Sequence, residues 1–209
     1  MSQQADQYPV QLSVDFPDRA LDRATTFLRL ITIIPIVIVL IAVAGSSSDD
    51  SGGQYATAGA GGAIVIAPLL MIVFRQKYPK WWFDWNVNLV QFSSRVAAYL
   101  FLLRDEYPST DEEQAVHIDI RYPDVQNDLN RWLPLVKWLL AFPHYIVLVL
   151  LWIALVVVVI VAWFAILFTG RYPQAIFGFV VGVMRWSLRV QAYALLLTTD
   201  RYPPFGMDP

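Results

Sequence analysis

The stretch LPLVKWLLAFPHYIVLVLLWIALVVVVIVAWFAILFT, residues 133–169, decides which class of fold this chain can adopt. It is apolar along almost its whole length, and as one helix it would extend about 55 Å, against the roughly 30 Å of a bilayer hydrocarbon core. Two arrangements fit that length. One is a transmembrane hairpin that turns near Trp152. The other is an interfacial piece up to Phe142, a kink at Pro143 and one tilted span from there to Phe168.

The residues around this stretch favour different arrangements. Arg131 and Lys137 lie at its start and four arginines follow it, so a single span would place basic residues on both sides of the membrane. Basic residues normally concentrate on the cytoplasmic side, which favours the hairpin. No Gly, Asn or Pro lies near Trp152 to make a turn, which favours one span. We expect the hairpin, with the single span as the alternative.

The composition of the 209 residues also indicates lipid as the main solvent. The chain is 57% hydrophobic and 15% charged, whereas a soluble domain has about 25% charged residues. A net charge of −2 argues against a nucleic-acid partner, and the absence of cysteine excludes disulfides and thiolate sites. Residues 1–17 lack the basic and apolar regions of a cleavable signal peptide.

Two further apolar stretches are each about one hydrocarbon thickness of helix, Phe27–Ala44 and Ala56–Phe74. Between them Gly45–Gly62 is rich in Gly and Ser and contains no Lys or Arg. The positive-inside rule therefore predicts an extracytoplasmic loop here, with both termini and residues 75–132 in the cytoplasm. The first half is thus predicted to be a transmembrane hairpin.

Short motifs recur in the same order in the two halves of the chain, and such self-similarity indicates a repeated unit. Each half has an alternating apolar segment, a basic helix start, an apolar region, a Tyr-Pro break and a Ser-x-Arg-Val-x-Ala-Tyr motif. The matching segments are Val10–Val14 with Val116–Ile120, Arg23, Arg29 and Pro35 with Arg131, Lys137 and Pro143, Ser93–Tyr99 with Ser187–Tyr193, and Asp105–Pro108 with Asp200–Pro203. We predict a first membrane repeat at 1–108 and a second at 109–209.

The predicted fold is therefore mainly α and integral to the membrane. Each of two tandem repeats contributes a short β-strand, a transmembrane hairpin and an amphipathic helix, which gives four spans in total, with three as the alternative. The amphipathic helices, residues 80–103 and 173–197, are expected to lie in the interface with the apolar face towards lipid. The pair Gly178 and Gly182 has the spacing that permits close helix packing.

Several segments resemble the bacterial membrane family called domain of unknown function 4389. In the second half these are Phe164–Pro173, Met184–Tyr193, Thr199–Phe205 and the Phe142-Pro-His144 turn, and in the first half Tyr8-Pro-Val-x-Leu and Arg23-x-x-x-Phe27-x-Arg29. The resemblance is looser in the first half, where Arg75-Gln76 stands in place of Thr-Gly and Ile36 in place of His. It implies a membrane architecture and brings no assigned activity.

The predicted site residues belong to two groups. Five basic side chains are expected to contact lipid headgroups or a protein partner: Arg29, Arg95, Lys137, Arg185 and Arg189. Eight aromatic side chains are expected in the interfacial layer, where Trp and Tyr concentrate: Tyr78, Tyr107, Tyr172, Tyr202, Trp81, Trp82, Trp85 and Trp186.

No motif indicates catalysis, a cofactor or a metal. The chain lacks a Gly-rich phosphate loop, a nucleophile elbow and a zinc signature. His144 has no co-ligands at suitable spacing, so a capping or interfacial role is expected. Asp15, Asp18 and Asp22 precede a predicted helix and are better suited to capping than to catalysis.

These features predict a non-catalytic accessory or scaffold subunit of a larger membrane assembly that contacts lipid headgroups. The expected location is the bacterial inner membrane, as a multi-pass protein with cytoplasmic termini. The expected partners are lipid and either another membrane protein or further copies of this chain, without nucleic acid. A transporter component for a lipid or small molecule is the alternative, and a membrane enzyme acting on lipid headgroups comes third.

Overall fold

Two short segments in which apolar and polar residues alternate form an antiparallel ribbon. The computed structural model describes residues 8–44, 60–110 and 112–208. In it, Val10 pairs with Ile120 and Leu12 with Ile118, so the apolar side chains of both strands lie on one face. Alternation of this kind is typical of a half-buried strand, and the strands lie where it predicts them. The polar side chains face the other way.

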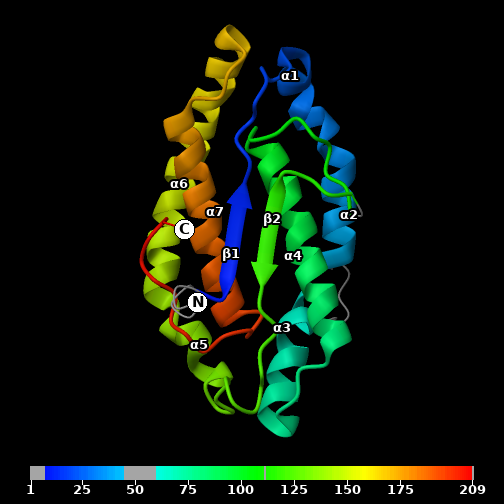
Figure 1. Ribbon diagram of the computed structural model, residues 1–209, viewed down its shortest axis with the longest axis vertical. Coiled ribbons are helices and arrows are strands. Elements are labelled where there is room, and N and C mark those ends of the chain that lie inside the picture. Colours follow the sequence, from blue (N-terminus) through cyan, green and yellow to red (C-terminus); the bar gives the residue numbers. More distant parts are fainter. Residues whose placement is uncertain (1–7, 45–59, 111, 209) are drawn as a thin grey trace, which may run out of the picture.

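Helices make up most of the remaining structure, and they cover the apolar face of the ribbon (Figure 1). In chain order the elements are β1 (Val10–Val14), α1 (Arg23–Thr32), α2 (Ile34–Ala44), α3 (Ala60–Leu70), the π-helix η1 (Met71–Arg75), α4 (Lys80–Leu100), β2 (Val116–Ile120), α5 (Pro134–Leu140), α6 (Phe142–Thr169) and α7 (Gln174–Ala194).

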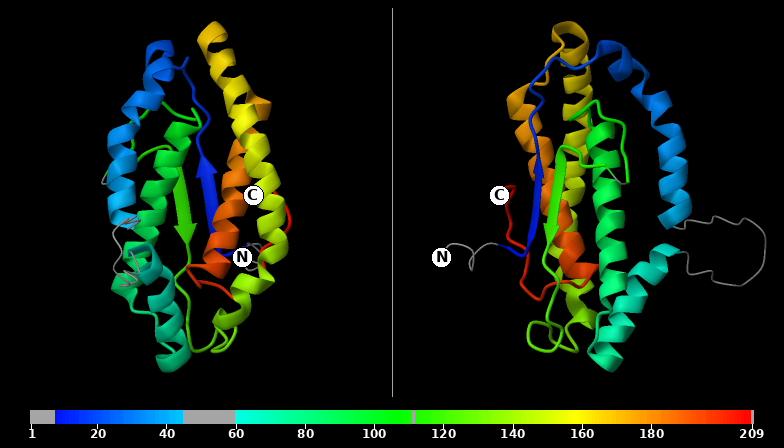
Figure 2. Two further views of the ribbon diagram at one scale, coloured as in Figure 1. Left: turned by 180° about the vertical axis from the view of Figure 1, so that it is seen from behind. Right: turned by 45° about the vertical axis from the view of Figure 1, so that its right-hand side comes forward.

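The elements form three layers. The ribbon is the first, and α7 packs on β1 while α4 packs on β2 to make the second. On the far side, α6 packs on α7 and contacts α1, and α2 packs on α4. The left view of Figure 2 shows this third layer from behind, in front of the ribbon, and the right view shows the molecule turned by 45° from Figure 1. We call α1, α2, α5 and α6 the outer helices.

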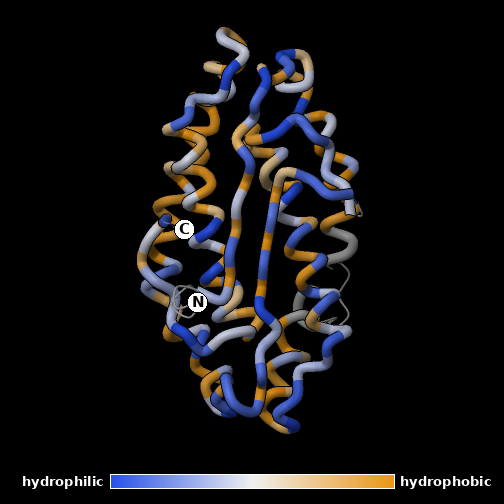
Figure 3. The backbone as a smooth tube through the Cα atoms, viewed as in Figure 1, coloured by the Kyte–Doolittle hydropathy of each residue, from blue (hydrophilic) through white to orange (hydrophobic). Residues whose placement is uncertain are grey.

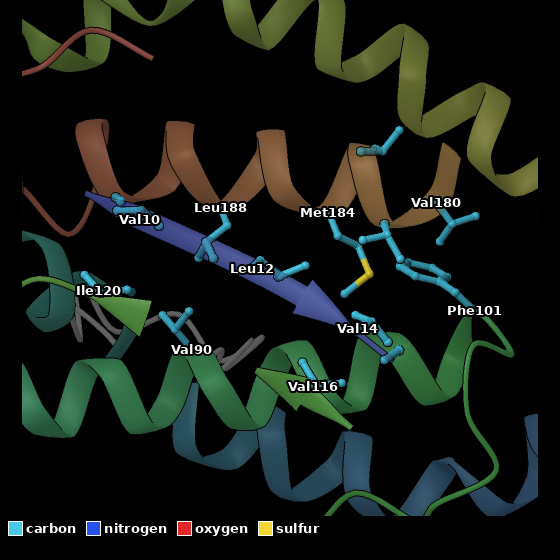
Figure 4. Close-up of a cluster of buried hydrophobic side chains, with 14 of the residues drawn as sticks. Val10, Leu12, Val14, Val90, Phe101, Val116, Ile120, Val180, Met184 and Leu188 are labelled. Carbon is cyan, nitrogen blue, oxygen red and sulfur yellow. The ribbon is translucent and has the colours of Figure 1, made fainter. Parts of the chain in front are cut away.

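The core lies between the ribbon and the second layer (Figure 4). Val10 and Leu12 of β1 are 1% and 3% exposed, and they belong to one buried cluster with Met184 and Leu188 of α7 and Val90 of α4. Apolar burial of this kind supplies about 25 cal/mol per Å² of area removed from water. The ribbon is therefore held by packing against α4 and α7.

The prediction of four transmembrane spans is wrong, and so is the alternative of three. Within the described residues, only α6 is by itself long and apolar enough to cross a bilayer. It continues through Trp152 without a turn, because no residue there favours leaving the helix. Residues 27–44 belong to α1 and α2, a pair bent by 51° near Ile33, and α3 has only 11 residues before the π-helix begins.

The prediction of two tandem repeats with the same membrane-hairpin architecture is also wrong. The second half has the short α5 and one 28-residue helix, whereas the first has α1, α2 and α3. The helices predicted to lie in the interface, residues 80–103 and 173–197, contain α4 and α7, which form the middle layer. Arg95, Arg185 and Arg189 on their polar stripes donate to backbone carbonyls of β1, of the segment before β2 and of the C-terminal segment, so this part of the amphipathic pattern marks contact with protein.

Part of the topology prediction lies outside the described residues. This applies to residues 45–59 of the predicted extracytoplasmic loop, to residues 1–7 and to residue 209. The last residues of that loop, 60–62, begin α3.

Candidate functional site

The outer helices carry a wide apolar surface that no part of the described chain covers. On α6 a narrow stripe is buried against the protein, formed by Leu148, Leu155, Ala162 and Ile166 together with His144. Only 17% of the most apolar part of this helix is buried. A helix in the core of a soluble protein is mostly buried, so α6 is not such a helix.

The exposed apolar side chains gather on the layer away from the ribbon. Figure 3 shows apolar residues along these helices and polar residues alternating along the strands. The large ones on the outer helices are Phe27, Leu28, Ile31, Ile34, Ile38, Val39, Leu135, Val136, Trp138, Leu139, Leu140, Phe142, Ile146, Val149, Leu150, Trp152, Ile153, Val156, Val157, Ile160, Val161, Phe164 and Phe168. A soluble monomer rarely exposes a contiguous apolar patch above a few hundred Å².

Arg29, predicted to contact headgroups or a partner, lies inside the protein. It is 1% exposed and forms an ion pair with Asp105. It also donates to the backbone carbonyls of Tyr99 and Arg104, each at 3.0 Å, and its guanidinium carbon lies 4.4 Å from the Tyr99 ring centroid. These contacts join the last turn of α1 to the end of α4 and the segment that follows it.

Lys137 makes the corresponding contacts in the second half. It is fully buried, its Nζ lies 2.7 Å from Asp200 Oδ1, and it donates to the carbonyl of Thr199 at 2.8 Å. It lies 5.2 Å from the Tyr193 ring centroid. Burial lowers the pKa of Lys137, and the carboxylate of Asp200 opposes this effect. The ion pair ties α5 to the segment after α7.

The three arginines of α4 and α7 donate to backbone carbonyls. Arg95 is 7% exposed and donates to Ser109 at 2.8 Å, and Arg189 is 3% exposed and donates to Asp208 at 2.8 Å. Arg185 is half-buried and donates to Leu12 of β1 at 3.0 Å and to Met207 at 2.8 Å. The structure thus brings Arg185 and Arg189 together beneath the C-terminal segment and places Arg95 under the segment before β2.

The predicted interfacial aromatics divide into buried and exposed groups. Tyr78 is buried and donates to the carbonyl of Leu196 at 3.1 Å, and Tyr172 is buried and donates to Phe101 at 3.2 Å. Trp186 is also buried. Trp82 is half-buried, and the exposed members are Tyr107, Tyr202, Trp81 and Trp85. Burial raises the pKa of Tyr78 to about 12.

His144 lies in an aromatic environment. Its ring stacks on Phe205 with centroids 3.9 Å apart, and Tyr202 lies 4.9 Å away. The indole of Trp186 donates to its Nδ1 at 3.1 Å. This is a packed structural position at the start of α6. No group of three or more His, Asp or Glu residues that could hold a metal occurs in the described chain.

Sequence reasoning missed Asp105 and Asp200 as site residues. The sequence contained a signal for both, because Asp-x-Tyr-Pro recurs in the two halves in step with Arg29 and Lys137. Those two basic residues were assigned to lipid headgroups or a protein partner, because they stand at the start of apolar stretches. A carboxylate that recurs with each of them is the better indication of a partner within the chain.

Comparison with known proteins relates the second half of the chain to one family. Residues 132–206 match the family described as Domain of unknown function (DUF4389). The matched region contains α5, α6, α7 and the segment that carries Asp200. No curated protein and no solved structure matches the chain.

Proposed function

We propose that this chain, whose residues 132–206 support membership of the DUF4389 family, is a non-catalytic membrane protein that binds lipid through its outer helices and serves as an accessory or scaffold subunit. One observation carries the proposal. The exposed surface of α6 is apolar over 28 residues, and α1, α2 and α5 extend this surface. Water is a poor solvent for such a surface, and the acyl region of a bilayer is a good one.

The energetic preference for lipid is large. Full transfer of a Val, Leu, Ile or Phe side chain from water to an apolar medium gains about 1.5–3 kcal/mol. Half of that gain, summed over the twelve large apolar side chains exposed on α6 alone, is about 9–18 kcal/mol, as large as the roughly 5–15 kcal/mol that stabilises a typical fold. This preference supports membrane binding, and we propose the bacterial inner membrane as its location because the family that the chain resembles is a bacterial membrane family.

The contacts of the buried basic side chains support the proposed non-catalytic role. Arg29 and Lys137 are neutralised by Asp105 and Asp200, and Arg189 holds the C-terminal segment. Each of these groups is engaged in holding the fold together, which suits a scaffold. The polar face of the ribbon is the surface that a partner subunit would meet.

Vesicle flotation tests the lipid-binding part of the proposal. The full chain, purified in mild detergent and diluted onto vesicles of neutral and anionic phospholipid, is expected to float with the vesicles. The double variant Ile153→Glu, Val157→Glu places two charges one turn apart on the exposed side of α6, and should bind at least tenfold more weakly. The control, Ser13→Glu with Gln126→Glu, adds the same charge at exposed positions away from the outer helices and should float normally. A wild-type chain that stays with the soluble fraction would contradict the proposal.

Purification from native membranes tests the accessory role. A tagged chain solubilised in mild detergent is expected to bring down one or more membrane proteins in fixed ratio. Recovery of this chain alone, at every detergent concentration tried, would rule out a stable accessory subunit.

A further inference from the structure

The geometry points to an orientation that the apolar surface alone does not specify: we propose that the molecule lies along the membrane surface, with α6 in the plane of the bilayer and the ribbon facing water. This inference rests on the proposed lipid binding. In this orientation the outer helices contact the bilayer and the ribbon contacts water.

Helix α6 and the ribbon lie side by side at the same level. Both run along the long axis of the molecule, with α7 between them (Figure 1). Trp152, near the middle of α6, donates its indole proton to Ser187 of α7 at 3.2 Å. Two residues away on α7, Arg185 donates to the carbonyl of Leu12 at the centre of β1. The middle of α6 is therefore level with the middle of the ribbon.

The ribbon is unsuited to the hydrocarbon core of a bilayer. Its outward face carries Ser13, His117 and Asp119, all exposed, and His117 lies 3.1 Å from Asp15. The sheet has two strands, so each strand has an outer edge. If α6 crossed the bilayer, these charged groups and both edges would lie at mid-membrane depth. Lipid-exposed sheet edges do not occur there, because their backbone groups have no hydrogen-bond partners in hydrocarbon.

An orientation of α6 in the plane of the bilayer suits its length and the basic residues before and after it. Its 28 residues extend about 42 Å, well beyond a hydrocarbon core of about 30 Å. Exposed basic residues lie before and after it in the chain. Arg131 precedes α5 and donates to the backbone carbonyls of Val73 and Phe74. Arg171 follows the end of α6, and Arg23 donates there to the carbonyl of Phe168 at 3.3 Å. In a flat orientation all three reach the headgroups of one leaflet and complement anionic phosphate.

Depth-dependent fluorescence quenching tests the orientation. The chain has no cysteine, so single cysteines can be labelled with an environment-sensitive dye at exposed positions of α6, namely Ile146, Val156 and Phe164, and of the ribbon, namely Ser13 and Asp119. The labelled proteins are bound to vesicles of neutral and anionic phospholipid that carry a quencher at a known depth on the acyl chain. Labels on α6 are expected at similar shallow depths, about 5–10 Å below the headgroups, and ribbon labels should be quenched only by aqueous iodide.

The alternatives give different patterns. If α6 spans the bilayer, the label at Val156 will be deepest, those at Ile146 and Phe164 will be shallower, and the ribbon labels will be protected from iodide; this pattern overturns the flat orientation but leaves lipid binding intact. If no label is quenched by lipid and the chain elutes as a dimer, a second copy covers the outer helices. In that case the proposed function fails as well.

Discussion

Removing the charge of Lys137 is the most direct test of what the buried ion pairs contribute. In Lys137→Met the aliphatic stem is preserved, while Asp200 and the carbonyl of Thr199 lose their partner. At 2.7 Å and an effective dielectric constant near 20, the attraction between the two charges is about 6 kcal/mol. Desolvation offsets part of it, and losing one member of a buried pair commonly destabilises by about 3–5 kcal/mol. The Asp200 side chain is 20% exposed, so we expect the lower end, about 3 kcal/mol.

The measurement is thermal unfolding in detergent micelles, followed by circular dichroism. For a chain of this size 3 kcal/mol corresponds to a fall of roughly 6–12 °C in Tm. Asp200→Asn should destabilise by a similar amount, since Lys137 is then buried without its counter-ion. The double variant should be less destabilised than the sum of the two single variants by at least 2 kcal/mol.

An exposed ion pair provides the matched control. Lys80 and Asp84 lie one turn apart on α4 with side chains 73% and 48% exposed. Such a pair contributes about 0.3–0.5 kcal/mol, so Lys80→Met should shift Tm by no more than about 2 °C. Additive effects of Lys137→Met and Asp200→Asn, with a coupling below about 0.5 kcal/mol, would show that the buried pair does not act as a unit and would refute the reasoning.

Two further predictions concern alkaline stability and helix packing. Burial raises the pKa of Tyr78 from about 10 to about 12, so the unfolded chain loses this proton first and the free energy of unfolding falls between these pH values, by on the order of 2–3 kcal/mol. Tyr78→Phe should flatten this part of a urea-unfolding series from pH 9 to 12, and an unchanged slope would contradict the assignment. A Cβ on Gly182 would lie 2.7 Å from the Cβ of Met207, so Gly182→Ala should displace the C-terminal segment and lower Tm. Gly178 has nothing within 4 Å, and Gly178→Ala should raise stability by up to about 1 kcal/mol; equal effects of the two alanines would rule out the close approach.

Local patterns predicted local structure well. The alternation of apolar residues placed both strands at the observed positions, and each Tyr-Pro pair at 78–79 and 172–173 ends at the start of a helix. These features depend on neighbouring residues only. The spacing of Gly178 and Gly182 was also recognised, but its partner was not, since Gly182 packs against the C-terminal segment and not against another helix.

The spans and the interfacial helices were predicted wrongly for a common physical reason. Hydropathy measures whether a segment avoids water, and by itself it gives neither the length of the helix that forms nor what its apolar face contacts. The arginines of α7 were assigned to lipid headgroups or a protein partner, and in the structure Arg185 and Arg189 hold β1 and the C-terminal segment of the same chain. The contact between Arg185 and Leu12 joins residues 173 positions apart, and such a contact leaves no periodic signal in either segment.

The ribbon has a further consequence, for the order of events during synthesis. Val14 and Val116, which pair across the two strands, are separated by about 100 residues of chain. At 5–20 residues per second, β1 emerges from the ribosome roughly 5–20 s before β2 can join it. During that interval β1 (Val10–Val14) has no strand to pair with. Under the proposed lipid binding, α1 and α2, made in the meantime, would hold the nascent chain near the membrane surface until the second strand arrives and closes the ribbon.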